Sequence, residues 1–190
     1  MQEPKNWIQT YSGAPFDFDN PEGHYFNVMD FAHALSMLCR YNGHTKRFYS
    51  VGEHLIRCSN LVPEKFAFEA LMHDVSEAYM SDMPRPLKNI MGEYKTLEVR
   101  IETAIAKQFN LPVPMSPEVK ECDNKILLIE REILMNDAPF PWNHYGTTPY
   151  TRTEFWNSML NVSAYTPDIV ESKFINRFNE LSAHRNKIAA

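Results

Sequence analysis

The chain has 190 residues, of which 44% are hydrophobic and 23% are charged, and its formal net charge is −5. This composition is typical of a single globular domain and excludes a long disordered chain. Because the balance is acidic and no long basic run occurs, we expect no nucleic-acid polymer as a partner. A local basic pocket for a small polyanion is compatible with the same composition.

The chain lacks the signals of export, membrane insertion and the common phosphate-binding loops. No apolar stretch approaches the ~20 residues of a membrane helix, and the first residues carry neither the basic nor the apolar region of an export signal. Cys39, Cys58 and Cys122 are widely spaced and odd in number, which indicates reduced thiols. We therefore expect a cytoplasmic protein without a membrane partner. The six glycines form neither GxGxxG nor GxxxxGKS/T.

Residues 1–27 are expected to form an irregular, aromatic-rich arm. Turn signals occur at residues 12–15 and 20–23. A short hairpin is possible within this arm, and little else in the chain is typical of strands. The arm carries six aromatic residues, so we expect it to pack onto the body of the protein.

The pattern from residue 27 onward is helical. Asn27 or Asp30 can cap a helix that runs to about residue 40. Ser50, with Glu53 three residues later, predicts a capping box and a helix to about residue 61. Further helices are expected over about 63–80, 88–109 and 116–136, and two more after the loop at 137–152, divided near Pro167. Prolines between these segments end the helices.

The sum of these elements is an all-α domain over residues 1–190 with about six or seven helices. It consists of the arm (1–27), a metal-binding helical core (28–136) and a C-terminal loop with helices (137–190).

Four side chains combine imidazole and carboxylate groups: His54, His73, Asp74 and Asp123. The adjacent His73 and Asp74 can turn toward one ion, although such a pair alone is usually a surface feature. His54 shares a helix face with apolar residues, so its imidazole needs a buried partner, either a metal or another polar group. Asp123 lies in an apolar stripe, where a carboxylate needs a cation or a salt bridge to Lys120 or Lys125. Together they predict a divalent metal site.

Two further carboxylates follow the pair His73 and Asp74. Glu77 lies on the same helix face, and Asp82 follows where the prolines bend the chain back. A carboxylate beside a metal can act as a general base or proton shuttle. Solvated surface carboxylates are the alternative for both.

A basic and aromatic group provides candidate substrate contacts. Its members are Arg40, Tyr41, His44, Lys46, Arg47, Arg85, Lys88 and Lys95. Arginine and lysine bind phosphate, and Tyr41 can stack on a base or sugar. About half of the group is expected to touch substrate.

Several of these residues lie in motifs whose order resembles that of the HD-domain phosphohydrolases. The motifs are AHALS (32–36), CRYNGH (39–44), YSVGEH (49–54), HDVSEAY (73–79), DMPRPLK (82–88) and the late Asp123. More narrowly, the chain is similar to the 5′-deoxynucleotidases and to phage dATP triphosphohydrolases. The family's Ala-Glu-His is Gly52-Glu53-His54 here, and the Arg-Trp of the nucleotidases is Arg40-Tyr41, which leaves the base contact open.

The resemblance implies a helical bundle with a divalent ion (Mn, Co, Zn, Ni or Mg) on His54, His73, Asp74 and Asp123. Glu77 would be the catalytic carboxylate, Asp82 its neighbour near phosphorus, and Arg40 and Tyr41 the nucleotide contacts. It also implies a homo-oligomer, either a dimer or a hexamer.

We therefore predict hydrolysis of dATP to deoxyadenosine and triphosphate, which would deplete dATP in a phage-infected cell. The alternatives are a 5′-deoxynucleotidase acting on deoxynucleoside monophosphates and a non-catalytic nucleotide-binding regulator.

Overall fold

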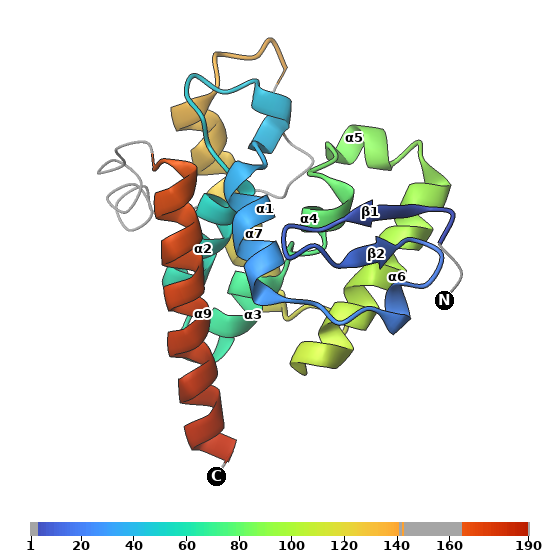
Figure 1. Cartoon of the computed structure of the whole chain (residues 1–190). Helices are drawn as coiled ribbons and strands as arrows, with labels where there is room; N and C mark the ends of the chain where they lie inside the picture. The colour runs from blue at the N-terminus through green and yellow to red at the C-terminus, as the bar shows by residue number, and fades with distance from the viewer. Residues whose placement is uncertain (1–3, 141, 143–164, 190) are drawn as a thin grey trace.

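A computed structural model of the chain describes residues 4–140, 142 and 165–189. The described part is helical apart from one two-stranded hairpin, which confirms the all-α prediction (Figure 1). The helices are α1 (Val28–Met37), α2 (Val51–Leu61), α3 (Ala67–Met72), α4 (Glu77–Met80), α5 (Arg85–Lys88), α6 (Gly92–Phe109), α7 (Pro117–Leu134) and α9 (Pro167–Ala189). Short 3-10 turns occur at Pro21–Gly23, Arg40–Gly43 and Glu64–Phe66. Within the described residues, no helix is both long and apolar enough for a membrane span.

The arm forms the predicted hairpin and packs onto the body. β1 (Trp7–Gln9) pairs antiparallel with β2 (Pro15–Asp17). Phe16 of β2 is completely buried and stacks on Tyr79, with ring centroids 4.2 Å apart. The loop of the hairpin is held by Asp30, whose carboxylate accepts hydrogen bonds from the backbone N–H and the hydroxyl of Ser12. An aromatic contact and a buried carboxylate thus fix the arm to α1 and α4.

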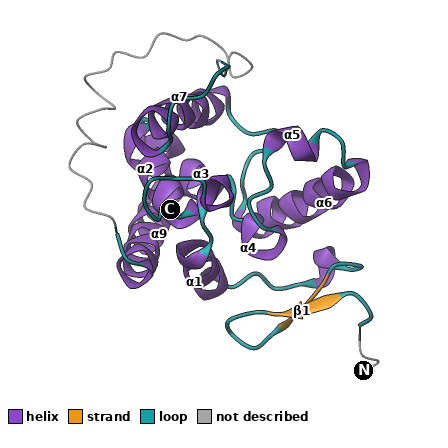
Figure 2. Ribbon diagram, turned by 90° about the horizontal axis from the view of Figure 1, so that it is seen from above, coloured by secondary structure: helices purple, strands orange, loops and turns teal. Residues whose placement is uncertain are grey.

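Helix α2 is the centre of the bundle. It contacts α1, α3, α7 and α9, and residues 51–59 are all buried. Figure 2, seen from above, shows these five helices gathered on one side, with α4, α5, α6 and the hairpin on the other. His54 is therefore buried whichever way it points around the helix axis, and its polar atoms require partners.

The predicted caps form, but the first helix is shorter than expected. The side chain of Asn27 accepts a hydrogen bond from the N–H of Met29, and Ser50 Oγ accepts one from the N–H of Glu53. The first helix ends at Met37 rather than near residue 40, because the next residues are extended and Cys39 forms a β-bridge with Ser50. The bridge and the 3-10 turn after it direct Arg40 back toward α7.

The helix predicted over 63–80 is wrong as a continuous element. It is divided into the turn Glu64–Phe66, α3 and α4, with residues 73–76 in turns. Here the N–H groups of Glu77 and Ala78 bond to carbonyls only three residues back, a tighter spacing than in an α-helix. Similarly, the helix predicted from residue 88 begins at Gly92, since 85–88 form the separate turn α5. Of the last two predicted helices, α9 begins at Pro167 as expected, and the earlier one lies outside the described residues.

Candidate metal centre and adjoining cavity

His54 is held by a buried carboxylate. Its Nδ1 lies 2.7 Å from Glu130 Oε1 on α7, and both side chains are completely buried. A carboxylate at Nδ1 favours the tautomer that carries its proton there and leaves the lone pair on Nε2. His54 therefore presents Nε2 as a potential ligand atom.

His73 is oriented in the same way by the backbone. Its Nδ1 lies 2.8 Å from the carbonyl oxygen of Ala70. Its Nε2 is buried and forms no well-aligned hydrogen bond among the described residues, although Asp74 Oδ2 lies 3.2 Å away. A buried polar atom without a well-aligned partner is costly, and a cation between the imidazole and this carboxylate would satisfy both.

The Nε2 atoms of both histidines converge with two carboxylates. One ligand atom from each of His54, His73, Asp74 and Asp123 lies within 4.8 Å of all the others. The separations are 3.5 Å from His54 Nε2 to Asp123 Oδ1, 3.9 Å from His73 Nε2 to the same oxygen, and 3.2 Å from His73 Nε2 to Asp74 Oδ2. Two ligands with ~2.0–2.3 Å bonds to one ion lie roughly 2.8–3.6 Å apart. These four side chains fit a divalent ion after small adjustments.

The pKa values of these groups reflect the close approach of imidazoles and carboxylates. Although burial opposes protonation of His73, the charge of Asp74 raises its pKa to about 9. Burial likewise opposes ionisation of Asp123, but His54 and His73 hold its pKa well below the usual range. The salt bridge considered for Asp123 is also present, since Lys120 Nζ lies 2.8 Å from Oδ2. The other oxygen, Oδ1, is the one that faces the histidines.

Glu130 is the residue that the sequence analysis missed. Besides His54, it accepts hydrogen bonds from Arg40 Nε and from the hydroxyls of Tyr41 and Tyr49. Burial raises the cost of its charge, but Arg40 and His54 lower the pKa of Glu130 to about 2. The spacing could have indicated it, because Glu130 follows Asp123 by seven residues and so lies two turns further along the same face of α7.

The carboxylate side of the metal centre opens into a cavity of ≈790 Å³. Asp74 and Asp123 line it, as do the two expected catalytic carboxylates, Glu77 and Asp82. Burial, together with the negative charge of Asp74 and Asp82, raises the pKa of Glu77 well above its usual value. Its Oε2 has no hydrogen-bond partner among the described residues. Glu77 is thus a buried carboxyl group with a raised pKa next to the potential metal ligands.

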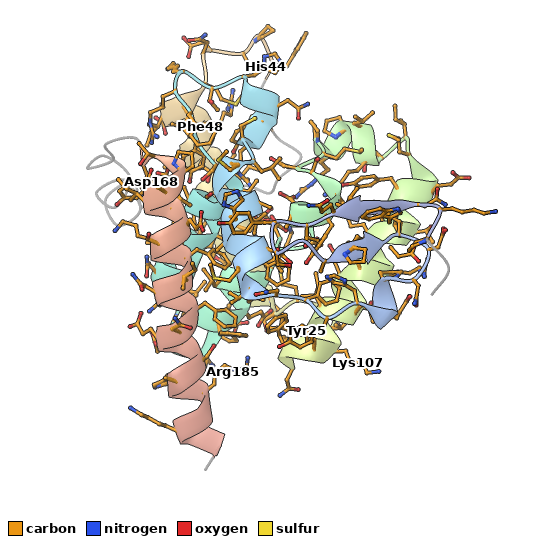
Figure 3. All side chains as sticks on the ribbon, viewed as in Figure 1. Tyr25, His44, Phe48, Lys107, Asp168 and Arg185 are labelled. Carbon is orange, nitrogen blue, oxygen red and sulfur yellow. The ribbon has the colours of Figure 1, made fainter. Side chains whose placement is uncertain are left out.

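The cavity includes most of the expected substrate contacts. Arg40, Tyr41, His44, Arg85 and Lys88 line it, whereas Lys46 and Lys95 are exposed and are not among the described residues of its wall. His44, which Figure 3 shows at the top of the molecule, is an exposed residue of the cavity wall. Trp142, which the sequence analysis did not single out, also lines the cavity, and its ring centroid lies 6.1 Å from that of Tyr41.

The whole arrangement is a candidate metal centre at the wall of a cavity of ≈790 Å³, in a helical protein. The chain belongs to the same family as the uncharacterized protein YfdR of Escherichia coli K12, with which it shares 40% identity over 181 residues. That match covers 95% of this chain and 98% of YfdR. The uncharacterized protein RCAP_rcc00048 of Rhodobacter capsulatus is 30% identical over 140 residues, which are 66% of this chain and 71% of that protein. No protein-family model matches the chain.

Proposed function

We propose that this chain is a metal-dependent phosphohydrolase that acts on deoxynucleotides. The observation that supports the proposal best is the convergence of four ligand atoms within 4.8 Å, from His54, His73, Asp74 and Asp123. Two of these ligands, Asp74 and Asp123, lie in the wall of the same cavity as Glu77. Potential metal ligands, the buried carboxyl group of Glu77 and space for a substrate are thus found at one cavity.

The residues around the centre have separable roles in such a reaction. A divalent ion bound there would acidify water and neutralise charge on phosphate oxygens. Glu77, a buried carboxyl beside the ligands, is suited to give a proton to the leaving group and, once that proton has left, to take one from water as the carboxylate. Burial and the negative charge of Asp74 and Asp82 favour its protonated form. Arg40 lines the cavity with its Nε fixed by Glu130, so its guanidinium is oriented before a phosphate arrives.

The first candidate reaction is attack on the α-phosphorus of dATP, with release of deoxyadenosine and triphosphate. A cavity of ≈790 Å³ lies within the roughly 300–1,000 Å³ typical of small-molecule sites. Tyr41 and Trp142 offer aromatic surface in its wall for a base.

A second candidate, a 5′-deoxynucleotidase acting on monophosphates, is favoured by the position of the cations. Of Lys46, Arg47, Arg85, Lys88 and Lys95, the described wall of the cavity includes only Arg85 and Lys88. Lys88 is already paired with Glu98. Arg40 and Lys120 also line the cavity, but they are paired with Glu130 and Asp123. Because three of its cations already have carboxylate partners, the described wall favours a monophosphate over the more negative triphosphate.

Product analysis distinguishes the candidates. The purified protein would be loaded with Mn²⁺ or Co²⁺ and offered dATP, dGTP, dCTP, dTTP and dAMP, with the products separated by chromatography. Deoxyadenosine with intact triphosphate supports the first candidate, and turnover of dAMP alone supports the second. Nucleotide binding without turnover of any compound contradicts both and indicates a regulator.

A further inference from the structure

A cysteine lies on the buried side of the metal centre. Cys58 follows His54 by four residues on α2, so both side chains project from the same face of the helix. Cys58 Sγ lies 3.5 Å from His54 Nε2, and both residues are completely buried. The thiol therefore faces the nitrogen that the carboxylate of Glu130 leaves available for an ion.

Cys58 completes a second group of potential ligands. One ligand atom each from His54, Cys58 and His73 lies within 4.8 Å of the other two. For a bond of about 2.0–2.1 Å to nitrogen and 2.3 Å to sulfur, tetrahedral coordination separates the two atoms by roughly 3.6 Å. The observed 3.5 Å between Cys58 Sγ and His54 Nε2 agrees with this value.

The two groups share both histidines and differ in the third kind of ligand. On the cavity side the histidines meet the carboxylates of Asp74 and Asp123, which are hard ligands suited to Mg²⁺ or Mn²⁺. On the buried side they meet a thiol, whose thiolate is a soft ligand that selects Zn²⁺ or Co²⁺. The two imidazoles therefore lie between carboxylate ligands on one side and a thiol ligand on the other.

We propose that Cys58 is a metal ligand, and that it binds a thiophilic ion, Zn²⁺ or Co²⁺, together with His54 and His73. The thiol proton passes to solvent as the sulfur–metal bond forms, so that binding releases one proton from Cys58. Since this assignment rests on the metal centre of the proposed function, it deepens that function by stating which ions the centre prefers and which residue causes the preference.

Cobalt absorption provides the test, because a cobalt–thiolate bond produces a sulfur-to-metal charge-transfer band that nitrogen and oxygen ligands do not. The metal-stripped full chain would be titrated with Co²⁺, and the charge-transfer and visible d–d bands recorded. We expect the charge-transfer band in the wild type and its loss in Cys58→Ser, with the d–d bands kept. We also expect Cys58→Ser to bind Zn²⁺ more weakly by about 100-fold or more, because loss of a hydrogen-bond partner of a ligand already costs about 10–100-fold. Its affinity for Mn²⁺ should be unchanged.

A matched control comes from the neighbouring cysteine. Cys122 Sγ lies 3.9 Å from the backbone oxygen of Cys58 but belongs to neither described ligand group. The double variant Cys39→Ser/Cys122→Ser leaves Cys58 as the chain's only cysteine and is expected to keep the band. It also provides the test if Cys58→Ser does not fold.

The outcomes separate this assignment from the proposed function. Cobalt bound with d–d bands but no charge-transfer band overturns Cys58 as a ligand and leaves the phosphohydrolase intact. A charge-transfer band that survives in folded Cys58→Ser, or that disappears in the double variant, also overturns it. The band without hydrolysis of any nucleotide overturns the proposed function and supports the ligand. Failure of the wild type to bind Co²⁺ contradicts both.

Discussion

Glu130 acts on the candidate metal centre through hydrogen bonds and is not among its potential ligands. Its carboxylate accepts from His54, Arg40, Tyr41 and Tyr49 while completely buried. It therefore orients a ligand of the metal and a cation of the cavity at the same time. An amide of the same shape cannot replace it, because its NH₂ group would face donors and the charge of Arg40 would lose its partner.

We expect Glu130→Gln to weaken metal binding by about 10–100-fold, the usual effect of removing a partner of a histidine ligand. The free energy of unfolding should fall by about 3–5 kcal/mol, since a buried charge remains uncompensated. Competition with a chromophoric chelator and urea unfolding measure the two effects. Glu118→Gln, at an exposed position of the same helix, is the control and should change neither. Wild-type metal affinity in Glu130→Gln would show that the hydrogen bond to His54 does not support the ligand.

Glu77 offers a way to separate catalysis from metal binding. It lies in the cavity wall but belongs to neither described ligand group. We expect Glu77→Gln to reduce turnover of the substrate found by product analysis by roughly 10²–10⁴-fold, the usual contribution of general acid–base catalysis. The metal content, measured by elemental analysis, should equal that of the wild type. Glu118→Gln, exposed at the start of α7, should keep full activity; loss of metal from Glu77→Gln would instead make Glu77 a ligand.

At the level of elements, Gly52 sets how closely α2 approaches its neighbours. A Cβ at this position would lie 2.8 Å from Val170 Cγ1 on α9 and 3.1 Å from the carbonyl oxygen of Leu35 on α1. Contacts this short require backbone or side-chain movement in a tightly packed core. A glycine at this position thus matches the close packing of three helices next to His54.

Gly52→Ala should therefore lower the free energy of unfolding by about 1–3 kcal/mol through overpacking. Helix propensity alone would instead raise the free energy of unfolding of this variant, because it favours alanine over glycine by ~1 kcal/mol. Gly92→Ala in the first turn of α6 is the matched control, because no described atom lies within 4 Å of its added Cβ. Urea unfolding of both variants measures the difference. A stabilised Gly52→Ala would mean that α9 can move away without cost.

The sequence predicts a helix end when a neighbouring side chain causes it. It does not predict an interruption that is caused by contacts with distant parts of the chain. Asn27 and Ser50 cap α1 and α2 with their own side chains, so the sequence alone predicts them. Residues 73–76 interrupt a segment with helical composition, and there the Ala70 carbonyl accepts from His73 Nδ1. The break turns His73 and Asp74 toward α2 and α7, contacts that no local pattern indicates. Residue types predicted the four side chains that converge as potential ligands, whereas Glu130 depends on partners 76 to 90 residues away.

At the level of the whole molecule, the ligands join parts of the chain that are far apart in sequence. His54 belongs to α2, His73 and Asp74 to the turns after α3, and Asp123 to α7. The unfolded chain does not hold these groups together, so an ion that binds them binds the native state preferentially. The free energy of that binding then adds to the free energy of unfolding.

We therefore expect the melting temperature to depend on the metal. With free metal at 100 times its Kd, linkage adds about 2.7 kcal/mol, which corresponds to roughly 5–10 °C for a chain of this size. Calorimetry in EDTA and in Mn²⁺ or Zn²⁺ measures the shift. Asp123→Ala should abolish it, because the variant lacks the carboxylate that faces both histidines, whereas the exposed Asp137→Ala should keep it in full. Equal melting temperatures of the wild type with metal and with chelator would show that these four side chains do not close around an ion.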